Sequence, residues 1–88
     1  MFYYLYVLKS CRARSLYIGY AHDLMKRIKQ HNSGQVAATK DHRPWKPVYY
    51  EAYRSKLDAL KREKRLKQFK NSYRELRKRI QQSIAAMR

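Results

Sequence analysis

Two tyrosine-rich apolar segments near the N-terminus constrain the fold more than any other feature of the sequence. Residues 2–9 and residues 15–20 are rich in Tyr, Leu, Ile and Val, which is typical of β-strands. The segment Ser10–Arg14 between them is short and polar. The two strands should therefore pair as an antiparallel hairpin.

The alternation of side chains predicts the register of this hairpin. The core-facing residues should be Leu and Val on the first strand and Leu and Ile on the second, because these alternate with tyrosines. Burying them together gives the expected pairs Leu5–Ile18, Val7–Leu16, Tyr6–Tyr17 and Tyr4–Gly19. This register would place two tyrosines side by side next to a bare glycine, as a shelf open to a ligand.

The rest of the chain alternates between helix, loop and strand signals. Asp23 is a good N-cap and Gly34 a good C-terminal stop, so residues 24–33 should form a helix. We then expect a loop over 35–47, a strand over 48–53, and helices over 56–70 and 72–86 that are separated at Asn71–Ser72. The 88 residues allow one domain, 1–88, with the element order ββαβαα.

The charge of the chain indicates its class of partner. It carries 22 Lys and Arg against 6 Asp and Glu, a formal net charge of +16. Nucleic acid is the first expectation, because lysine and arginine neutralise phosphates and release their counterions. No apolar run approaches the ~20 residues of a membrane span, so we expect no membrane contact. The single Cys11 favours a reducing compartment, and we expect a cytoplasmic protein.

One acidic residue lies where apolar residues are expected. On the predicted helix 56–70, Glu63 falls between Leu60 and Leu66, near the centre of the apolar stripe. A lone buried acid is costly unless it is paired or binds a metal. The structural interpretation is a salt bridge to a nearby arginine. The functional one is a ligand of a hard divalent cation, which needs only one or two carboxylates when water and phosphate supply the rest.

These residues resemble the paired motif of the GIY-YIG endonuclease superfamily, most closely its small stand-alone bacterial members related to the N-terminal nuclease domain of the ABC excinuclease. The motif residues are Tyr4-Leu5-Tyr6, Tyr17-Ile18-Gly19, Asp23-Leu24, Arg27, His31-Asn32, Gly34 and Glu63, and the resemblance covers about residues 3–70. It implies an α+β fold with a small three-stranded antiparallel sheet flanked by three helices. The basic helix 72–86 would follow the motif region.

The resemblance also implies roles for individual residues. Glu63 looks like the metal ligand, for Mg²⁺ or Mn²⁺, and Arg27 like the arginine that contacts phosphate. Tyr6 and Tyr17 look like the motif tyrosines, one of which is the candidate general base, and His31 occupies an accessory position. The residues expected to contact nucleic acid are Gly19, Tyr20, Lys26, Arg43 and Lys67.

Two departures from the family pattern are visible. Tyr4 stands where the family name has Gly, and Tyr20 stands where excinuclease-type domains carry a lysine after the second motif. The missing lysine removes one cation that could stabilise the transition state. A partner protein for targeting is expected, because no second DNA-binding domain follows the motif region.

The sequence thus predicts a divalent-metal-dependent DNA endonuclease, either structure-selective or weakly specific. DNA is favoured over RNA as substrate. The alternative is a non-catalytic DNA- or RNA-binding module, in which exposed tyrosines stack bases and the lysines and arginines contact phosphates.

Overall fold

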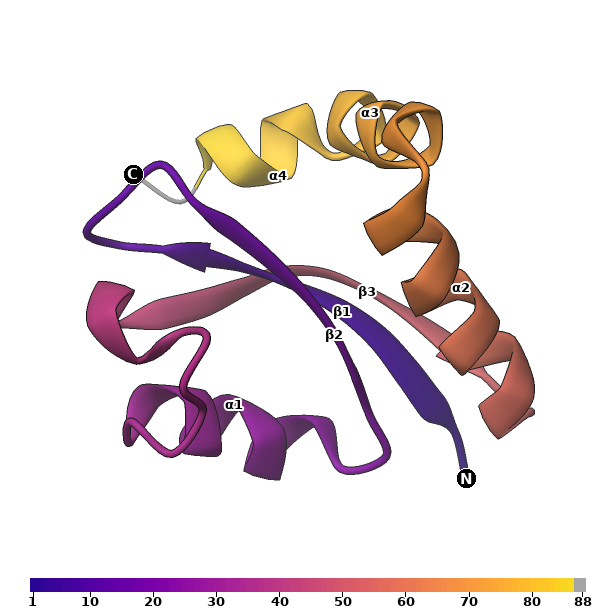
Figure 1. The fold of residues 1–88 in the computed structure, drawn as a ribbon, viewed down its shortest axis with the longest axis horizontal. Coiled ribbons are helices and arrows are strands. Elements are labelled where there is room, and N and C mark those ends of the chain that lie inside the picture. The colour runs from indigo at the N-terminus through magenta and orange to yellow at the C-terminus, as the bar shows by residue number, and fades with distance from the viewer. Residues whose placement is uncertain (87–88) are drawn as a thin grey trace.

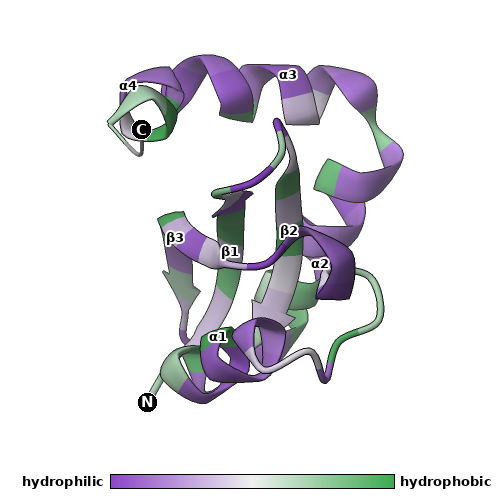
Figure 2. Cartoon of the chain, turned by 90° about the vertical axis from the view of Figure 1, so that its left-hand side faces the viewer, coloured by the Kyte–Doolittle hydropathy of each residue, from purple (hydrophilic) through white to green (hydrophobic). Residues whose placement is uncertain are grey.

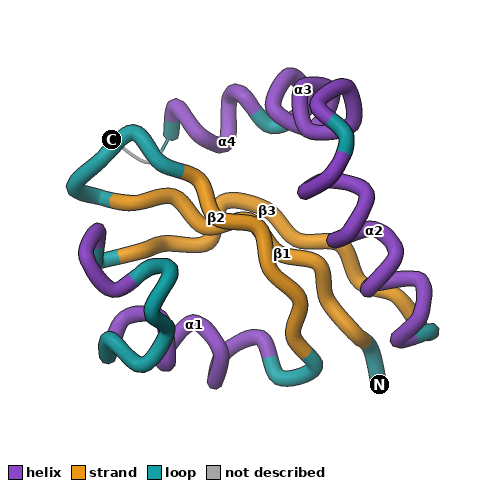
Figure 3. Tube along the Cα trace, in the orientation of Figure 1, coloured by secondary structure: helices purple, strands orange, loops and turns teal. Residues whose placement is uncertain are grey.

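The computed structural model of the chain describes residues 1–86, so the last two residues of the expected domain lie outside the described part. Its elements are β1 (Tyr3–Ser10), β2 (Leu16–Ala21), α1 (Leu24–Asn32), a 3-10 helix (Lys40–His42), β3 (Trp45–Tyr53), α2 (Lys56–Gln68), α3 (Lys70–Arg79) and α4 (Gln81–Ala85). The strands form one antiparallel sheet in the order β2-β1-β3 (Figure 3). The predicted α+β class with a three-stranded antiparallel sheet is confirmed.

The sheet forms the middle layer of the molecule, with α1 on one side and α2, α3 and α4 on the other (Figure 1). The core cluster on the side of α2–α4 comprises Leu5, Val7, Ile18, Leu66, Leu76 and Ile80, and the cluster on the side of α1 comprises Tyr6, Leu8, Ala21 and Trp45. Figure 2 shows hydrophobic residues along the strands and mostly hydrophilic residues along α3. The predicted division of the leucine-containing and tyrosine-containing faces is therefore correct.

The predicted register of the hairpin is wrong by two residues. Tyr6 pairs with Gly19, and Val7 pairs with Ile18. The loop between β1 and β2 sets the register. Ser10 remains in β1, and its amide donates to Ser15 O at 3.0 Å. A shift of two residues leaves every side chain on its original face, so alternation alone cannot detect it.

The third strand begins earlier than predicted, at Trp45 rather than at residue 48. The side chain of Asn32, at the end of α1, bonds both backbone groups of Trp45: its Nδ2 donates to Trp45 O at 2.9 Å, and its Oδ1 accepts from Trp45 N at 2.7 Å. The indole Nε1 of Trp45 donates to Thr39 O at 2.7 Å. These bonds fix the expected loop to the end of α1 and extend the strand into it.

The C-terminal helices divide differently from the prediction. The break after α2 lies at Phe69, which caps both α2 and α3, and not at Asn71–Ser72. The expected helix 72–86 is two helices, because Ile80 leaves helical geometry between α3 and α4 and is buried in the core, 3% exposed. No helix within residues 1–86 is long and apolar enough to cross a membrane.

Candidate active site

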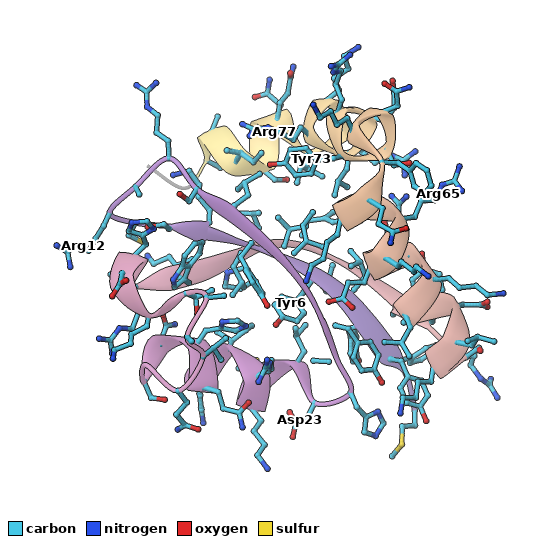
Figure 4. All side chains as sticks on the ribbon, in the orientation of Figure 1. Tyr6, Arg12, Asp23, Arg65, Tyr73 and Arg77 are labelled. Atoms are coloured by element: carbon cyan, nitrogen blue, oxygen red, sulfur yellow. The ribbon has the colours of Figure 1, made fainter. Side chains whose placement is uncertain are left out.

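The ring of Tyr6 lies over Gly19 on the neighbouring strand. Tyr6 is only 1% exposed, and the two residues are direct cross-strand partners. A Cβ atom at position 19 would lie 2.5 Å from Cζ of Tyr6 and closer still to its hydroxyl oxygen. Only glycine leaves room for the ring to cross the edge strand β2. Figure 4 shows Tyr6 in the middle of the molecule, between α1 and α2.

Tyr6, His31 and Thr39 form a buried chain of hydrogen bonds. Because the single proton of the Thr39 hydroxyl is directed to the carbonyl of Val36 at 3.3 Å, we assign Nδ1 of His31 as the donor to Thr39 Oγ1 at 2.8 Å. With its proton on Nδ1, His31 accepts at Nε2 the bond that the Tyr6 hydroxyl donates at 2.7 Å. The phenolic proton of Tyr6 is therefore used in the bond to His31. Toward any other group, the Tyr6 oxygen can act only as a hydrogen-bond acceptor.

Burial keeps both members of the Tyr6–His31 pair uncharged. Burial raises the pKa of Tyr6 to about 12, while the nearby guanidinium of Arg27 opposes this shift. Burial also lowers the pKa of His31 to about 4, and there the positive charge of Arg27 acts in the same direction. At neutral pH the pair is therefore a neutral phenol bonded to a neutral imidazole.

Tyr17, Lys67 and Glu63 complete the site from β2 and α2. The ring of Tyr17 lies 4.9 Å from that of His31 and 6.4 Å from that of Tyr6, measured between centroids. Lys67 Nζ lies 5.3 Å from the centroid of the Tyr17 ring and 3.3 Å from Glu63 Oε2. The charge of Glu63 also contributes to the raised pKa of Tyr6. Lys67 thus links the carboxylate of Glu63 to the ring of Tyr17.

Arg27 is the cation on the α1 side of this group. It is half-buried, and its Nη1 donates to Gln30 Oε1 at 3.1 Å on the next turn of the helix. Its charge acts on both Tyr6 and His31. The structure therefore gathers the five predicted catalytic residues from four elements, β1, β2, α1 and α2.

The pairing of Glu63 differs from the expected salt bridge to an arginine. Its partner is Lys67, one helical turn away, and the Glu63 side chain is 22% exposed. A partly exposed pair of this kind is weak, so the carboxylate can exchange its partner for a metal ion.

The donor set of the site fits a hard divalent cation. Within residues 1–86, no group of three or more His, Cys, Asp and Glu side chains could hold a metal ion. A protein-enclosed Zn²⁺ site needs such a group. Mg²⁺ commonly uses one or two carboxylates and completes its shell with water and substrate phosphate, and Glu63 can supply that carboxylate.

Two of the residues expected at the nucleic acid, Lys67 and Gly19, lie in this group, and a third, Lys26, lies on the same helix as Arg27. Lys67 contacts Glu63 and Tyr17, and Lys26 is exposed on α1 next to Arg27 in sequence. Gly19 is buried beneath Tyr6, so its place is explained by packing. The prediction that both tyrosines are open to a ligand is wrong for Tyr6, because the Tyr6 ring is inaccessible to solvent.

The two remaining residues take part in other contacts. Tyr20 stacks on Tyr3, with ring centroids 6.5 Å apart and planes 10° apart. The Arg43 guanidinium packs against Gly34, and its Nε donates to Lys40 O at 2.7 Å. Their expected contact with nucleic acid stays a prediction.

Sequence reasoning missed Thr39, which fixes the tautomer of His31. Thr39 is completely buried, but it lies in the segment expected to be a loop, and no local pattern marks it. It also missed Glu51, which accepts hydrogen bonds from Arg62, Tyr49 and Tyr53. Burial raises the pKa of the Glu51 carboxyl, but the bonds from Arg62 and Tyr53 outweigh this effect and leave that pKa below its ordinary value. Glu51 joins β3 to α2.

This fold and this set of side chains define a GIY-YIG domain. Residues 2–82 match the model of the GIY-YIG catalytic domain, and the chain belongs to this nuclease family. A UPF0213 protein of Staphylococcus saprophyticus is 50% identical over 68 residues, which are 76% of this chain and 82% of the relative. A UPF0213 protein of Staphylococcus aureus is 46% identical over the same shares.

A solved structure agrees with these relatives. The solution NMR structure of a UPF0213 protein from Bacillus halodurans superposes with a TM-score of 0.53 at 34% identity, covering 86% of this chain and 81% of that one. The predicted resemblance to small stand-alone members of the family is confirmed.

Proposed function

We propose that the chain is a divalent-metal-dependent DNA endonuclease whose active site consists of Tyr6, Tyr17, Arg27, His31 and Glu63. The observation that carries this proposal is that Lys67 links Glu63, on α2, to the ring of Tyr17, which lies against Tyr6 and His31. The net charge of +16 supports a polyanionic substrate.

Tyr17 is the better candidate for the general base. It is half-buried, whereas Tyr6 is inaccessible and has a pKa of about 12. Acting as the general base, the phenolic oxygen of Tyr17 would take a proton from the attacking water. Tyr6 then acts as a positioning residue, because its proton is held by His31 and its oxygen can only accept a hydrogen bond.

Arg27 and Glu63 act on the phosphate from opposite sides. The Arg27 guanidinium would bind a phosphate oxygen and offset the negative charge that develops as water attacks. Glu63 would hold Mg²⁺ or Mn²⁺, and the bound cation supplies Lewis-acid polarisation of the phosphate and stabilises the leaving oxygen. Lys67 must release Glu63 for this to occur.

The burial of Tyr6 weighs against the non-catalytic binding module. A single-strand binder presents its aromatic rings to bases, but Tyr6 donates its hydroxyl proton inward and is 1% exposed. A neutral, buried tyrosine–histidine pair is better suited to positioning the neighbouring side chains than to stacking bases.

Plasmid nicking tests the proposal. Supercoiled DNA is incubated with the protein in Mg²⁺, Mn²⁺ or EDTA, and nicked product is expected only with metal. Glu63→Gln should abolish nicking and retain DNA binding, while Glu75→Gln, which removes an exposed acid on α3, should cut normally. Cleavage by Glu63→Gln, or cleavage in EDTA, would overturn the assignment.

A further inference from the structure

A groove of about 480 Å³ leads away from the candidate active site along α2 and α3. Its polar and aromatic lining consists of Tyr17, Lys67, Gln68, Phe69, Lys70 and Tyr73. Leu16, Ile18 and Leu66 also line it. Tyr17 and Lys67 belong to both the site and the groove, so the two are continuous. The groove is large enough for a small ligand or for part of a longer one.

Each aromatic side chain of this groove is paired with a cation. Arg65 lies 5.6 Å from the centroid of Phe69, Lys67 lies 5.3 Å from Tyr17, and Arg77 lies 5.9 Å from Tyr73. Figure 4 shows that Arg65, Tyr73 and Arg77 lie on the same side of the molecule, over α2 and α3. Single-stranded nucleic acid is bound by aromatic rings that stack its bases together with cations that contact its phosphates, and this part of the surface supplies both.

Phe69 is the aromatic residue of this groove whose position is not explained by packing in the core. It is 54% exposed at the break between α2 and α3. It forms a wall shared by this groove and a neighbouring one, whose other lining includes Arg65, Lys61 and Lys64. Arg65 lines only the neighbouring groove, so it does not occupy the groove that Phe69 shares with Tyr17 and Tyr73.

We propose that this groove holds unpaired bases of a single-stranded DNA segment next to the phosphate that the site cleaves, with Phe69 as a stacking platform. The inference rests on the proposed function, because it names the form of DNA that the nuclease would engage. Base-paired DNA presents its bases only at their edges, so a ring in a narrow groove can stack only on a base that has left the duplex. Lys67 and Lys70 would contact the phosphates on either side.

Equilibrium binding in EDTA tests this proposal separately from catalysis. Fluorescence anisotropy would compare three labelled ligands of about 12 nucleotides: a single strand, the same strand with abasic central positions, and the duplex. Phe69→Ala should weaken binding of the intact strand by at least about fivefold. Binding of the abasic strand and of the duplex should change less than twofold, because they rely on phosphate contacts.

Matched variants separate stacking from general effects on the protein. Leu57→Ala removes an equally exposed apolar side chain, 59% exposed, from the first turn of α2 and should change nothing. Phe69→Leu keeps apolar volume but removes the aromatic face, so it should behave like Phe69→Ala, and Phe69→Trp should bind like the parent protein. These two variants keep the test valid if Phe69→Ala does not fold.

The outcomes distinguish the two proposals. Equal losses on all three ligands, or no loss on the intact strand, would overturn the stacking groove whether or not the protein cuts DNA. A base-dependent loss would support the groove even if plasmid nicking fails, in which case only the proposed function would fall.

Discussion

The Tyr6 hydroxyl donates its proton to Nε2 of His31 over 2.7 Å, and this bond gives the two motif tyrosines different environments. A phenol whose proton is held by a buried imidazole positions its neighbours, while the half-buried Tyr17 can meet water. The two residues lie 6.4 Å apart between ring centroids and are chemically identical. Their different environments therefore allow a direct comparison by the same substitution.

Tyr17→Phe and Tyr6→Phe should fail in different ways. Losing the base should slow nicking by about 100-fold or more with little change in stability. Losing the Tyr6 hydroxyl leaves Nε2 of buried His31 without its partner, which should cost about 1–3 kcal/mol of unfolding free energy. Nicking rates and urea unfolding curves of both variants test this. A larger loss of nicking in folded Tyr6→Phe would reverse the two roles.

Gly19→Ala should destabilise the protein through Tyr6 alone. The new methyl group would meet the buried ring, and overpacking of this kind costs about 1–3 kcal/mol. A double-mutant cycle measured by urea unfolding isolates the cause, because the cost of Gly19→Ala should nearly disappear when Tyr6 is already Leu. Equal costs in the two backgrounds would show that backbone effects, rather than the ring, require glycine at this position.

Sequence reasoning placed the motif tyrosines on the correct face of the sheet but in the wrong register. Alternation fixes which face a strand residue occupies, so Tyr6 and Tyr17 were assigned correctly to one face. It cannot distinguish registers that differ by two residues, and the deciding contact is local to the hairpin, where Ser10 Oγ accepts from the amides of Arg12 and Ala13. The role of Gly19 depends on that register and was therefore not predicted.

Long-range contacts explain two further features that the sequence did not predict, the early start of β3 and the hydrogen-bond partner of His31. The motif predicts no contact for Asn32, yet its side chain bonds the backbone of Trp45 and starts β3 early. Thr39 lies eight positions from His31 in a segment without helical or strand periodicity. Its partner is set by the path of the loop, which only tertiary packing defines.

The stability of the fold should fall as the pH drops from about 7 to 4 because of His31. Its pKa is about 4 when buried and about 6.5 in the unfolded chain, so the unfolded state binds more protons in this range. The loss should reach up to about 3 kcal/mol. Urea unfolding across this range should show a shallower dependence on pH in His31→Gln. His42→Gln, which removes an exposed imidazole, should follow the parent protein; identical slopes in all three proteins would contradict the prediction.

Lys67→Gln should lower the concentration of Mg²⁺ needed for nicking. The ammonium group lies 3.3 Å from Glu63 Oε2, where it occupies one carboxylate oxygen and repels an incoming cation. Because a partly exposed pair is worth at most about 1 kcal/mol, the half-maximal Mg²⁺ concentration should fall by up to about fivefold. DNA affinity should decrease at the same time, because one phosphate contact is lost. The slope of the logarithm of the binding constant against the logarithm of the salt concentration should fall by about one.

A lysine at the start of the same helix provides the control for this effect. Lys56 is exposed in the first turn of α2, far along the helix from Glu63, so Lys56→Gln can weaken DNA binding without changing the Mg²⁺ requirement. The measurement is a Mg²⁺ titration of nicking at saturating DNA, which removes the contribution of affinity. An unchanged or increased Mg²⁺ requirement in Lys67→Gln would mean that Lys67 does not compete with the cation, and that Glu63 holds the metal through a different arrangement or not at all.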